Sequence, residues 1–261
     1  MKQRILTAII GLVIFIPVIW YGNLPFVIIA YLLGTVALFE LIRMYFPNGF
    51  IWKLILSSIF LWMIMFPRES VSFVNVTWTK LEVIVLFAVT LLVMTVVTKN
   101  KFTFDHGAFL LFATMYVGIA FYLLIELRHE GLNYLLFVLF IIWATDSGAY
   151  FTGKLFGKRK LWPEISPNKT IGGAIGGVIC ALLVGMIFQI SYPFEHTFLV
   201  IIIFSIVISI VGQIGDLVAS AIKRHYEIKD FGRIFPGHGG ILDRLDSLLF
   251  VLLVLYIVPF V

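Results

Sequence analysis

One polar stretch near the C-terminal end of the sequence gathers the residue types that handle phosphate groups. It reads SAIKRHYEIKDFGRIFPGHGGILDRLD from Ser220 to Asp246 and lies between two apolar segments. Basic and acidic side chains surround its glycine-rich segment: Lys223, Arg224, Lys229, Arg233 and Arg244 against Glu227, Asp230, Asp243, Asp246 and, just upstream, Asp216. Glycines leave backbone N–H groups uncovered for an anion, and carboxylate oxygens are the ligands that Mg²⁺ prefers. The stretch therefore predicts a metal-assisted phosphate site.

Helices must position these side chains. If the preceding apolar helix continues past Asp216, then Asp216, Ser220 and Lys223 fall at i, i+4 and i+7 and share one face. Asp243 and Asp246 are three residues apart at the start of the next apolar segment, so they also share a face. Converging carboxylates repel one another unless a cation lies between them. The alternative is a set of interfacial ion pairs, and the neighbouring glycines favour the anion and metal site.

His238, within the glycine-rich segment, has three interpretations that the sequence leaves open. It could contact a phosphate, act as a base, or order the loop around it.

A second polar stretch runs from residue 146 to residue 173. Asp146 ends an apolar segment, where burial of a carboxylate is costly, so a functional role is expected for it. Lys169 stands just before a new helix, whose N-terminus favours anions. The basic run 158–160 is expected to contact anionic lipid headgroups. The glycine pairs at 172–173 and 176–177 are interpreted as close helix packing rather than phosphate cradles.

The composition of the chain indicates an integral membrane protein. Its 261 residues are 61% hydrophobic with a mean hydropathy of +1.08, and only 13% are charged, against about 25% in soluble domains. Apolar segments recur throughout, so we expect one membrane domain over 1–261, with a helical scaffold over 1–130 and the site over 131–261. The net charge of +5 is interpreted as the positive-inside bias rather than as a nucleic-acid footprint.

The apolar segments predict an all-α polytopic fold of about nine transmembrane helices. Their expected ranges are 5–21, 24–42, 51–66, 81–98, 107–125, 132–149, 171–190, 197–215 and 244–261. With a cytoplasmic N-terminus, only Arg68, Lys80 and Arg128 of the 19 basic residues fall outside, which supports this orientation. The two long polar loops then share the cytoplasmic face. Small residues of the seventh helix would pack within the chain or across a homodimer.

These motifs resemble a known family. The pattern Ser220-x-x-Lys223-Arg224-x4-Lys229-Asp230-Phe231-Gly232, followed by Pro236-Gly237-His238-Gly239-Gly240-x-x-Asp243-Arg244-x-Asp246, looks like the signature of the phosphatidate cytidylyltransferases, or CDP-diacylglycerol synthases. Ser166-Pro167-x-Lys169-Thr170 is similar to the same family's second motif. The family commonly continues with Trp-Glu-Gly, whereas this chain has Ile171-Gly172-Gly173, so any role of that glutamate is absent here or supplied elsewhere.

The resemblance implies a polytopic enzyme of the cell membrane that converts CTP and phosphatidic acid into CDP-diacylglycerol and pyrophosphate, with its active site facing the cytoplasm. It implies Mg²⁺, with room for a second cation, bound by Asp216 and Asp243 with Asp246 in support. Catalytic roles are expected for Lys223, Arg224, Asp243 and Asp246. Substrate contacts are expected from Asp146, Ser166, Asn168, Lys169, Ser220, Lys229, Asp230, Gly237, His238, Gly239, Gly240 and Arg244. Beyond the two substrates and membrane lipids, no nucleic-acid partner is expected.

Two alternatives remain. A CTP-dependent polyprenol or lipid kinase would use similar residues but direct attack at the γ-phosphorus of CTP. A lipid or anion transporter would usually place its site near the midplane of the membrane and have paired halves. Here the polar residues gather in the C-terminal half of the sequence, which counts against transport.

Overall fold

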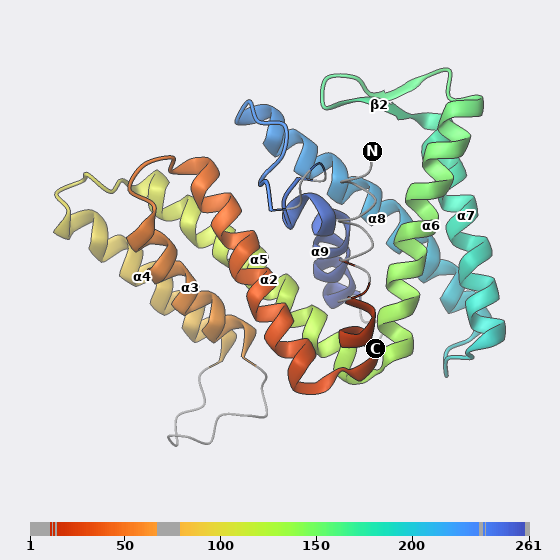
Figure 1. Ribbon diagram of the computed structural model, residues 1–261, viewed down its shortest axis with the longest axis horizontal. Helices are drawn as coiled ribbons and strands as arrows, with labels where there is room; N and C mark the ends of the chain where they lie inside the picture. Colours follow the sequence, from red (N-terminus) through yellow and green to blue (C-terminus); the bar gives the residue numbers. More distant parts are fainter. Residues whose placement is uncertain are drawn as a thin grey trace. The chain divides into compact units, whose positions relative to one another are not determined.

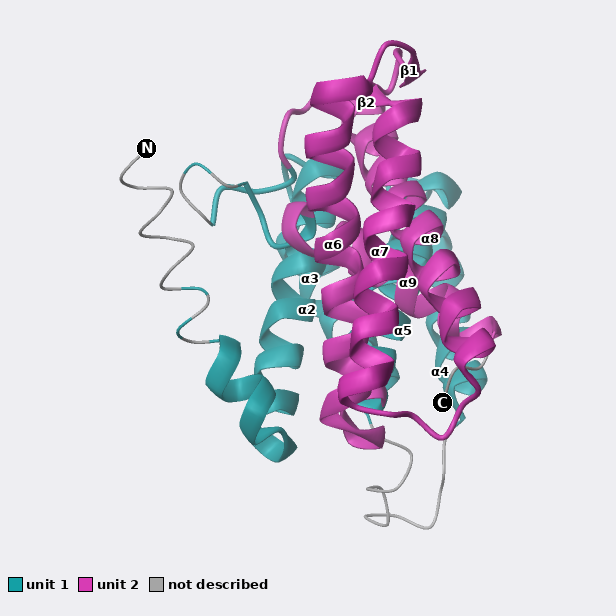
Figure 2. Ribbon diagram, turned by 90° about the vertical axis from the view of Figure 1, so that its right-hand side faces the viewer, with its two compact units in different colours: residues 1–126, 231–242 teal, residues 127–230, 243–261 magenta. Residues whose placement is uncertain are grey.

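The computed structural model describes residues 11, 13, 15–66, 79–234, 237 and 239–258. The described residues form two compact units (Figure 2). Unit 1 runs to Glu126 and also includes Phe231–Leu242, and unit 2 contains Leu127–Asp230 and the residues from Asp243 onwards. The polar stretch of the sequence is therefore divided between the two units.

Unit 1 is built from helices (Figure 1). Helical residues 15–21 precede α2 (Asn23–Tyr45), α3 (Ile51–Met65), α4 (Lys80–Val97) and α5 (Phe104–Glu130), whose last residues pass into unit 2. The core consists of fully buried aliphatic and aromatic side chains, including Leu38, Leu61 and Phe121. The rings of Phe60 on α3 and Phe87 on α4 stack with centroids 4.4 Å apart, which joins these two helices.

Unit 2 combines helices with a small hairpin. Its elements are α6 (Leu132–Phe156), β1 (Lys160–Trp162), β2 (Ser166–Thr170), α7 (Ile171–Ser191), α8 (Phe198–His225) and α9 (Leu242–Ile257), of which the first residue lies in unit 1. The strands pair antiparallel, with Lys160 opposite Thr170 and Trp162 opposite Ser166. Thr170 then caps α7, because its Oγ1 accepts a hydrogen bond of 3.1 Å from the N–H of Gly173. The cap fixes the direction in which β2 enters α7.

The interface of α6 with α7 is the most extensive helix pair of unit 2. A Cβ added at Gly177 would lie 2.8 Å from the carbonyl oxygen of Thr145, and one at Gly173 would lie 2.7 Å from that of Ala149. At Gly176 it would overlap the side chain of Thr152. The expectation that these glycines serve close helix packing is confirmed.

The structure confirms an all-α, multi-pass membrane fold. In the described part of the chain, six helices are long and apolar enough to cross a membrane: α2, α4, α5, α6, α7 and α8. The helices α3 and α9 have 15 and 16 residues. The total of nine crossings, the orientation and the single domain with its division near residue 130 stay predictions.

Three helices extend furthest beyond their expected ranges. The sixth helix continues to Phe156 instead of ending at residue 149, the eighth to His225 instead of 215, and the fifth spans Phe104–Glu130 instead of 107–125. Apolar content marks where the membrane-facing part of a helix ends, whereas its backbone hydrogen bonds continue through polar residues until a breaker intervenes. On α6 the C-cap is Gly157, whose N–H bonds to the carbonyl of Gly153. The region expected as a loop over 150–170 is consequently the end of α6 followed by the hairpin.

Candidate active site

The first charged pair of the site joins β2 to α8. The Nζ atom of Lys169 lies 2.6 Å from Oδ2 of Asp216 and donates a further hydrogen bond of 3.3 Å to the carbonyl of Gln213. The side chains of Lys169 and Asp216 are 26% and 36% exposed. The Nε2 of Gln213 in turn donates to the carbonyl of Ala174 on α7, at 3.3 Å. The end of β2 and the start of α7 are therefore held against the middle of α8.

The second charged pair joins α8 to α9. The Nζ atom of Lys223 lies 2.8 Å from Oδ1 of Asp243. Because α8 extends to His225, Asp216, Ser220 and Lys223 share one helical face, as expected from their spacing. Asp243 and Asp246 both lie in the first turns of α9, which was also expected.

Two further carboxylates belong to the same cluster. Asp146 on α6 and Asp246 on α9 each interact electrostatically with Asp216, and Asp246 also does so with Asp146 and with Lys223. The Oδ1 of Asp246 accepts a hydrogen bond of 2.8 Å from the N–H of Ser247. We call these residues the polar cluster: Asp146, Lys169, Asp216, Lys223, Asp243 and Asp246.

The charges of the polar cluster suit a cation. Its carboxylates outnumber its lysines, so an excess of negative charge is confined among oxygen donors, and a hard divalent cation fits such a donor set. Within the described ranges, no group of three or more His, Cys, Asp or Glu side chains is already arranged to hold a metal ion. Asp216 and Asp243 are instead each paired with a lysine. Metal binding by Asp216, Asp243 and Asp246 stays a prediction.

The hairpin contributes the second predicted motif. Its Ser166 is half-buried and Asn168 is exposed, both on β2. The Nε of Arg224, near the end of α8, donates to the carbonyl of Ile165 at 3.4 Å. This contact connects the hairpin to the basic end of α8. The following residues Lys229 and Asp230 are exposed, as is Arg244 in the first turn of α9.

The glycine-rich segment lies in unit 1. Gly237 and Gly239 have φ values of +80° and +87°, a left-handed conformation that favours glycine. Gly240 is buried, and His238 lies outside the described residues. The polar cluster lies in unit 2, and the contact of Gly237, Gly239 and Gly240 with substrate stays a prediction.

One residue of this region was not found from the sequence. Glu40, near the end of α2, is 2% exposed, and its carboxylate accepts hydrogen bonds from the N–H groups of Ile241, at 2.9 Å, and Leu242, at 3.0 Å. The signal was present, because a single acidic residue in an apolar helix is costly and usually has a purpose. The same argument supports the expectation of a functional role for Asp146.

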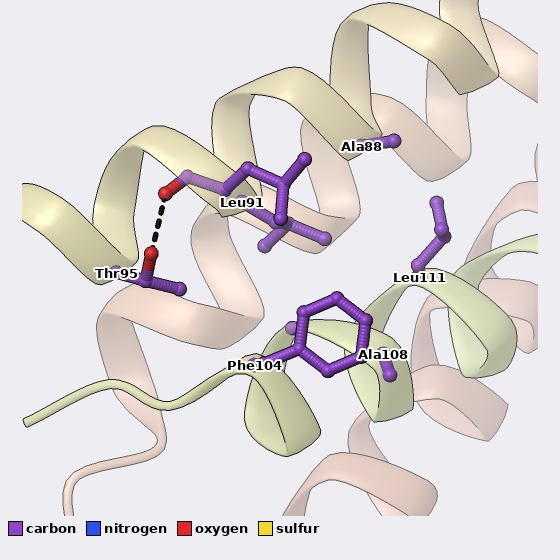
Figure 3. A pocket seen from close by; sticks show the side chains of 8 residues that line it. Ala88, Leu91, Thr95, Phe104, Ala108 and Leu111 are labelled. Atoms are coloured by element: carbon purple, nitrogen blue, oxygen red, sulfur yellow. Dashed lines mark hydrogen bonds between the residues drawn. The ribbon is translucent and has the colours of Figure 1, made fainter. Parts of the chain in front are cut away.

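A cavity of about 140 Å³ lies between α4 and α5 (Figure 3). Leu91, Leu92, Phe104 and Leu111 contribute to its lining, and the hydroxyl of Thr95 bonds to the carbonyl of Leu92 at 2.7 Å. None of its lining residues belongs to the predicted site. It is an apolar space between two helices of unit 1 rather than a site for a polyanion.

The fold defines a multi-pass membrane protein, and its unit 2 carries the polar cluster. Residues 2–261 match the model of the cytidylyltransferase family, and the chain belongs to that family. It is 45% identical over 259 residues to the phosphatidate cytidylyltransferase of Bacillus subtilis, covering 98% of this chain and 96% of that protein. The enzymes of the same name from Staphylococcus saprophyticus and Staphylococcus aureus are 46% and 44% identical to this chain over 252 residues. Each alignment covers 97% of this chain and 96% of the relative.

Proposed function

We propose that this protein transfers the cytidylyl group of CTP to phosphatidic acid, which yields CDP-diacylglycerol and pyrophosphate. A phosphate oxygen of phosphatidic acid attacks the α-phosphorus of CTP, and the bond to the β-phosphate breaks. Phosphatidic acid carries an anionic nucleophile near neutral pH, so no strong general base is required.

The main support is similarity over the whole chain to proteins named for this activity. The polar cluster adds an independent chemical argument. Both substrates are polyanions, one dissolved in water and one held in the membrane. The polar cluster combines ammonium groups with oxygen donors on β2, α6, α8 and α9 of a membrane protein.

The lysines have distinct roles in this proposal. Lys169, part-exposed beside Asp216 near the end of β2, contacts the triphosphate. Lys223 is oriented by Asp243 and stabilises the negative charge that develops on the transferred phosphoryl group. Arg224, exposed and attached to the hairpin through Ile165, stabilises the same charge.

Mg²⁺ is part of the proposal, with Asp216 and Asp243 as its principal ligands and Asp246 in support. When bound, it lowers the repulsion between the triphosphate and the carboxylates and stabilises the leaving pyrophosphate. The carboxylates also keep the lysines in place, as the two ion pairs illustrate.

The proposed location is the cell membrane, with the polar cluster at the cytoplasmic face. The distribution of basic residues supports this orientation. CTP is available on that side, and phosphatidic acid reaches the site within the leaflet.

The test is incorporation of label from CTP into chloroform-soluble lipid by purified protein in mixed micelles. Label in the α-phosphate should enter the lipid only when phosphatidic acid and Mg²⁺ are both present. Transfer of γ-label to a lipid alcohol, without α-label, would contradict the proposal and indicate a CTP-dependent kinase. If folded protein transfers neither the α-label nor the γ-label, the proposal is also contradicted, and transport becomes the favoured alternative.

A further inference from the structure

The carboxylate of Glu40 occupies the N-terminus of α9. The first N–H groups of a helix have no partner within the helix, and they form the positive end of its dipole. At α9 the N–H of Leu242 and that of Ile241 just before it both donate to Glu40, one to each carboxylate oxygen. A buried side chain of α2 thus supplies the anion that this helix end attracts.

Glycines make room for this carboxylate. A Cβ built at Gly232 or at Gly240 would overlap the Glu40 carboxyl group. Gly232 does not have a left-handed φ, so its backbone conformation alone does not require glycine. Two of the glycines of the signature motif, Gly232 and Gly240, therefore lie directly against Glu40 in unit 1.

The residue after Leu242 is Asp243. Its carboxylate is nearly buried and holds Lys223, and Asp246 follows one turn later. The backbone immediately before Asp243 is fixed by the two hydrogen bonds to Glu40. Removing them would release the first turn of α9, from which Asp243 projects.

We infer that Glu40 is a positioning residue for the cytidylyl transfer, because it fixes the backbone of Ile241 and Leu242 at the start of α9. The inference rests on the proposed function. Glu40 is 2% exposed and covered by backbone, so it acts through Asp243 and not by contact with substrate. It extends the functional residues to the N-terminal half of the chain.

Glu40→Gln is the primary variant, since it preserves the volume of the side chain and replaces one acceptor oxygen with an N–H₂ donor. We expect kcat to fall by about tenfold or more, as for other residues that orient a charged site. The KM for CTP should change by less than about threefold, because binding groups such as Lys169 are untouched. Hydrogen exchange should accelerate in peptides covering 231–242 and remain unchanged in α6 and α7.

Glu82→Gln is the matched control. Glu82 also lies at a helix N-terminus of unit 1, where its Oε2 accepts from the N–H of Thr79 at 2.6 Å. No predicted site residue lies on α4, so kcat should stay within about twofold of the parent.

Gly232→Ala tests the contact from the opposite side. Its methyl group should displace the carboxylate and lower kcat as Glu40→Gln does. Adding Glu40→Asp, whose side chain is shorter by one methylene, should restore part of that loss.

The outcomes separate the inference from the proposed function. If Glu40→Gln accelerates hydrogen exchange over 231–242 but leaves kcat unchanged, the positioning role is wrong. If hydrogen exchange in this variant is unchanged, the contact between Glu40 and the start of α9 is wrong. If Glu40→Gln does not fold, partial rescue of Gly232→Ala by Glu40→Asp decides the question, and its failure counts against the inference. If the parent protein does not transfer α-label from CTP, the proposed function fails, while the exchange measurement still tests the contact.

Discussion

Lys223 on α8 and Asp243 on α9 form an ion pair, with 2.8 Å between Nζ and Oδ1. The two side chains are only 16% and 4% exposed. Charges shielded from water interact more strongly than surface pairs, and removal of one partner leaves the other uncompensated. The pair therefore connects α8 to α9 and orients the Lys223 ammonium group.

Replacing Asp243 with asparagine should abolish the transfer. The amide keeps the shape of the side chain but loses the charge that orients Lys223, so turnover should fall by about 100-fold or more. Turnover of α-labelled CTP and the amount of folded protein in the membrane should be measured together. Asp105→Asn, at an exposed position in the first turn of α5, is the control and should be silent. Near-normal turnover of Asp243→Asn would refute the role of this carboxylate.

Lys169 and Asp216 should behave as a coupled unit. The 2.6 Å ion pair predicts that Lys169→Met and Asp216→Asn each lower kcat/KM for CTP. If the two effects were independent, the fold losses in kcat/KM would multiply in the double variant. We expect its kcat/KM to be about tenfold higher than that product predicts. Lys160→Met, at an exposed position of β1, combined with Asp216→Asn should give simple additivity. If Lys169→Met and Asp216→Asn are also additive, the ion pair does not contribute to activity.

Activity should require a divalent cation. Chelation with EDTA should remove turnover and added Mg²⁺ should restore it. Asp246→Asn should raise the Mg²⁺ concentration for half-maximal turnover by about tenfold, because one oxygen donor of the polar cluster is lost. Glu164 is an exposed carboxylate of the hairpin, and Glu164→Gln is the control that should leave the Mg²⁺ activation curve unchanged. An unchanged Mg²⁺ activation curve for Asp246→Asn would remove it from the metal site.

The packing of α6 against α7 predicts a stability effect. In Gly176→Ala the new methyl group would overlap Thr152, so the free energy of unfolding should fall by about 1–3 kcal/mol. Thermal unfolding in detergent, followed by circular dichroism, measures the change. In Gly212→Ala on α8, the nearest atom to the new Cβ is 3.6 Å away at Val251, and stability should be retained. If Gly176→Ala and Gly212→Ala have equal melting temperatures, α6 and α7 can move apart to accommodate the methyl group without loss of stability.

The sequence alone determined the class of the fold and which candidate site residues share a helical face. Apolar segments of sufficient length predicted the helices, because the membrane requires every backbone group to be bonded within its own segment. The spacing of Asp216, Ser220 and Lys223 predicted their common face, since helical periodicity is local. The signature motif itself indicated the family to which the full-length match assigns the chain.

Only the tertiary structure decided which charges meet. The partners of Asp216 and Asp243 lie 47 and 20 positions away in the sequence, at Lys169 and Lys223, and no local pattern encodes such contacts. The same holds for Glu40, whose bonds to Ile241 and Leu242 span about 200 residues. Local periodicity fixes which side chains share a face, but the packing of distant helices selects the side chain that meets each of them.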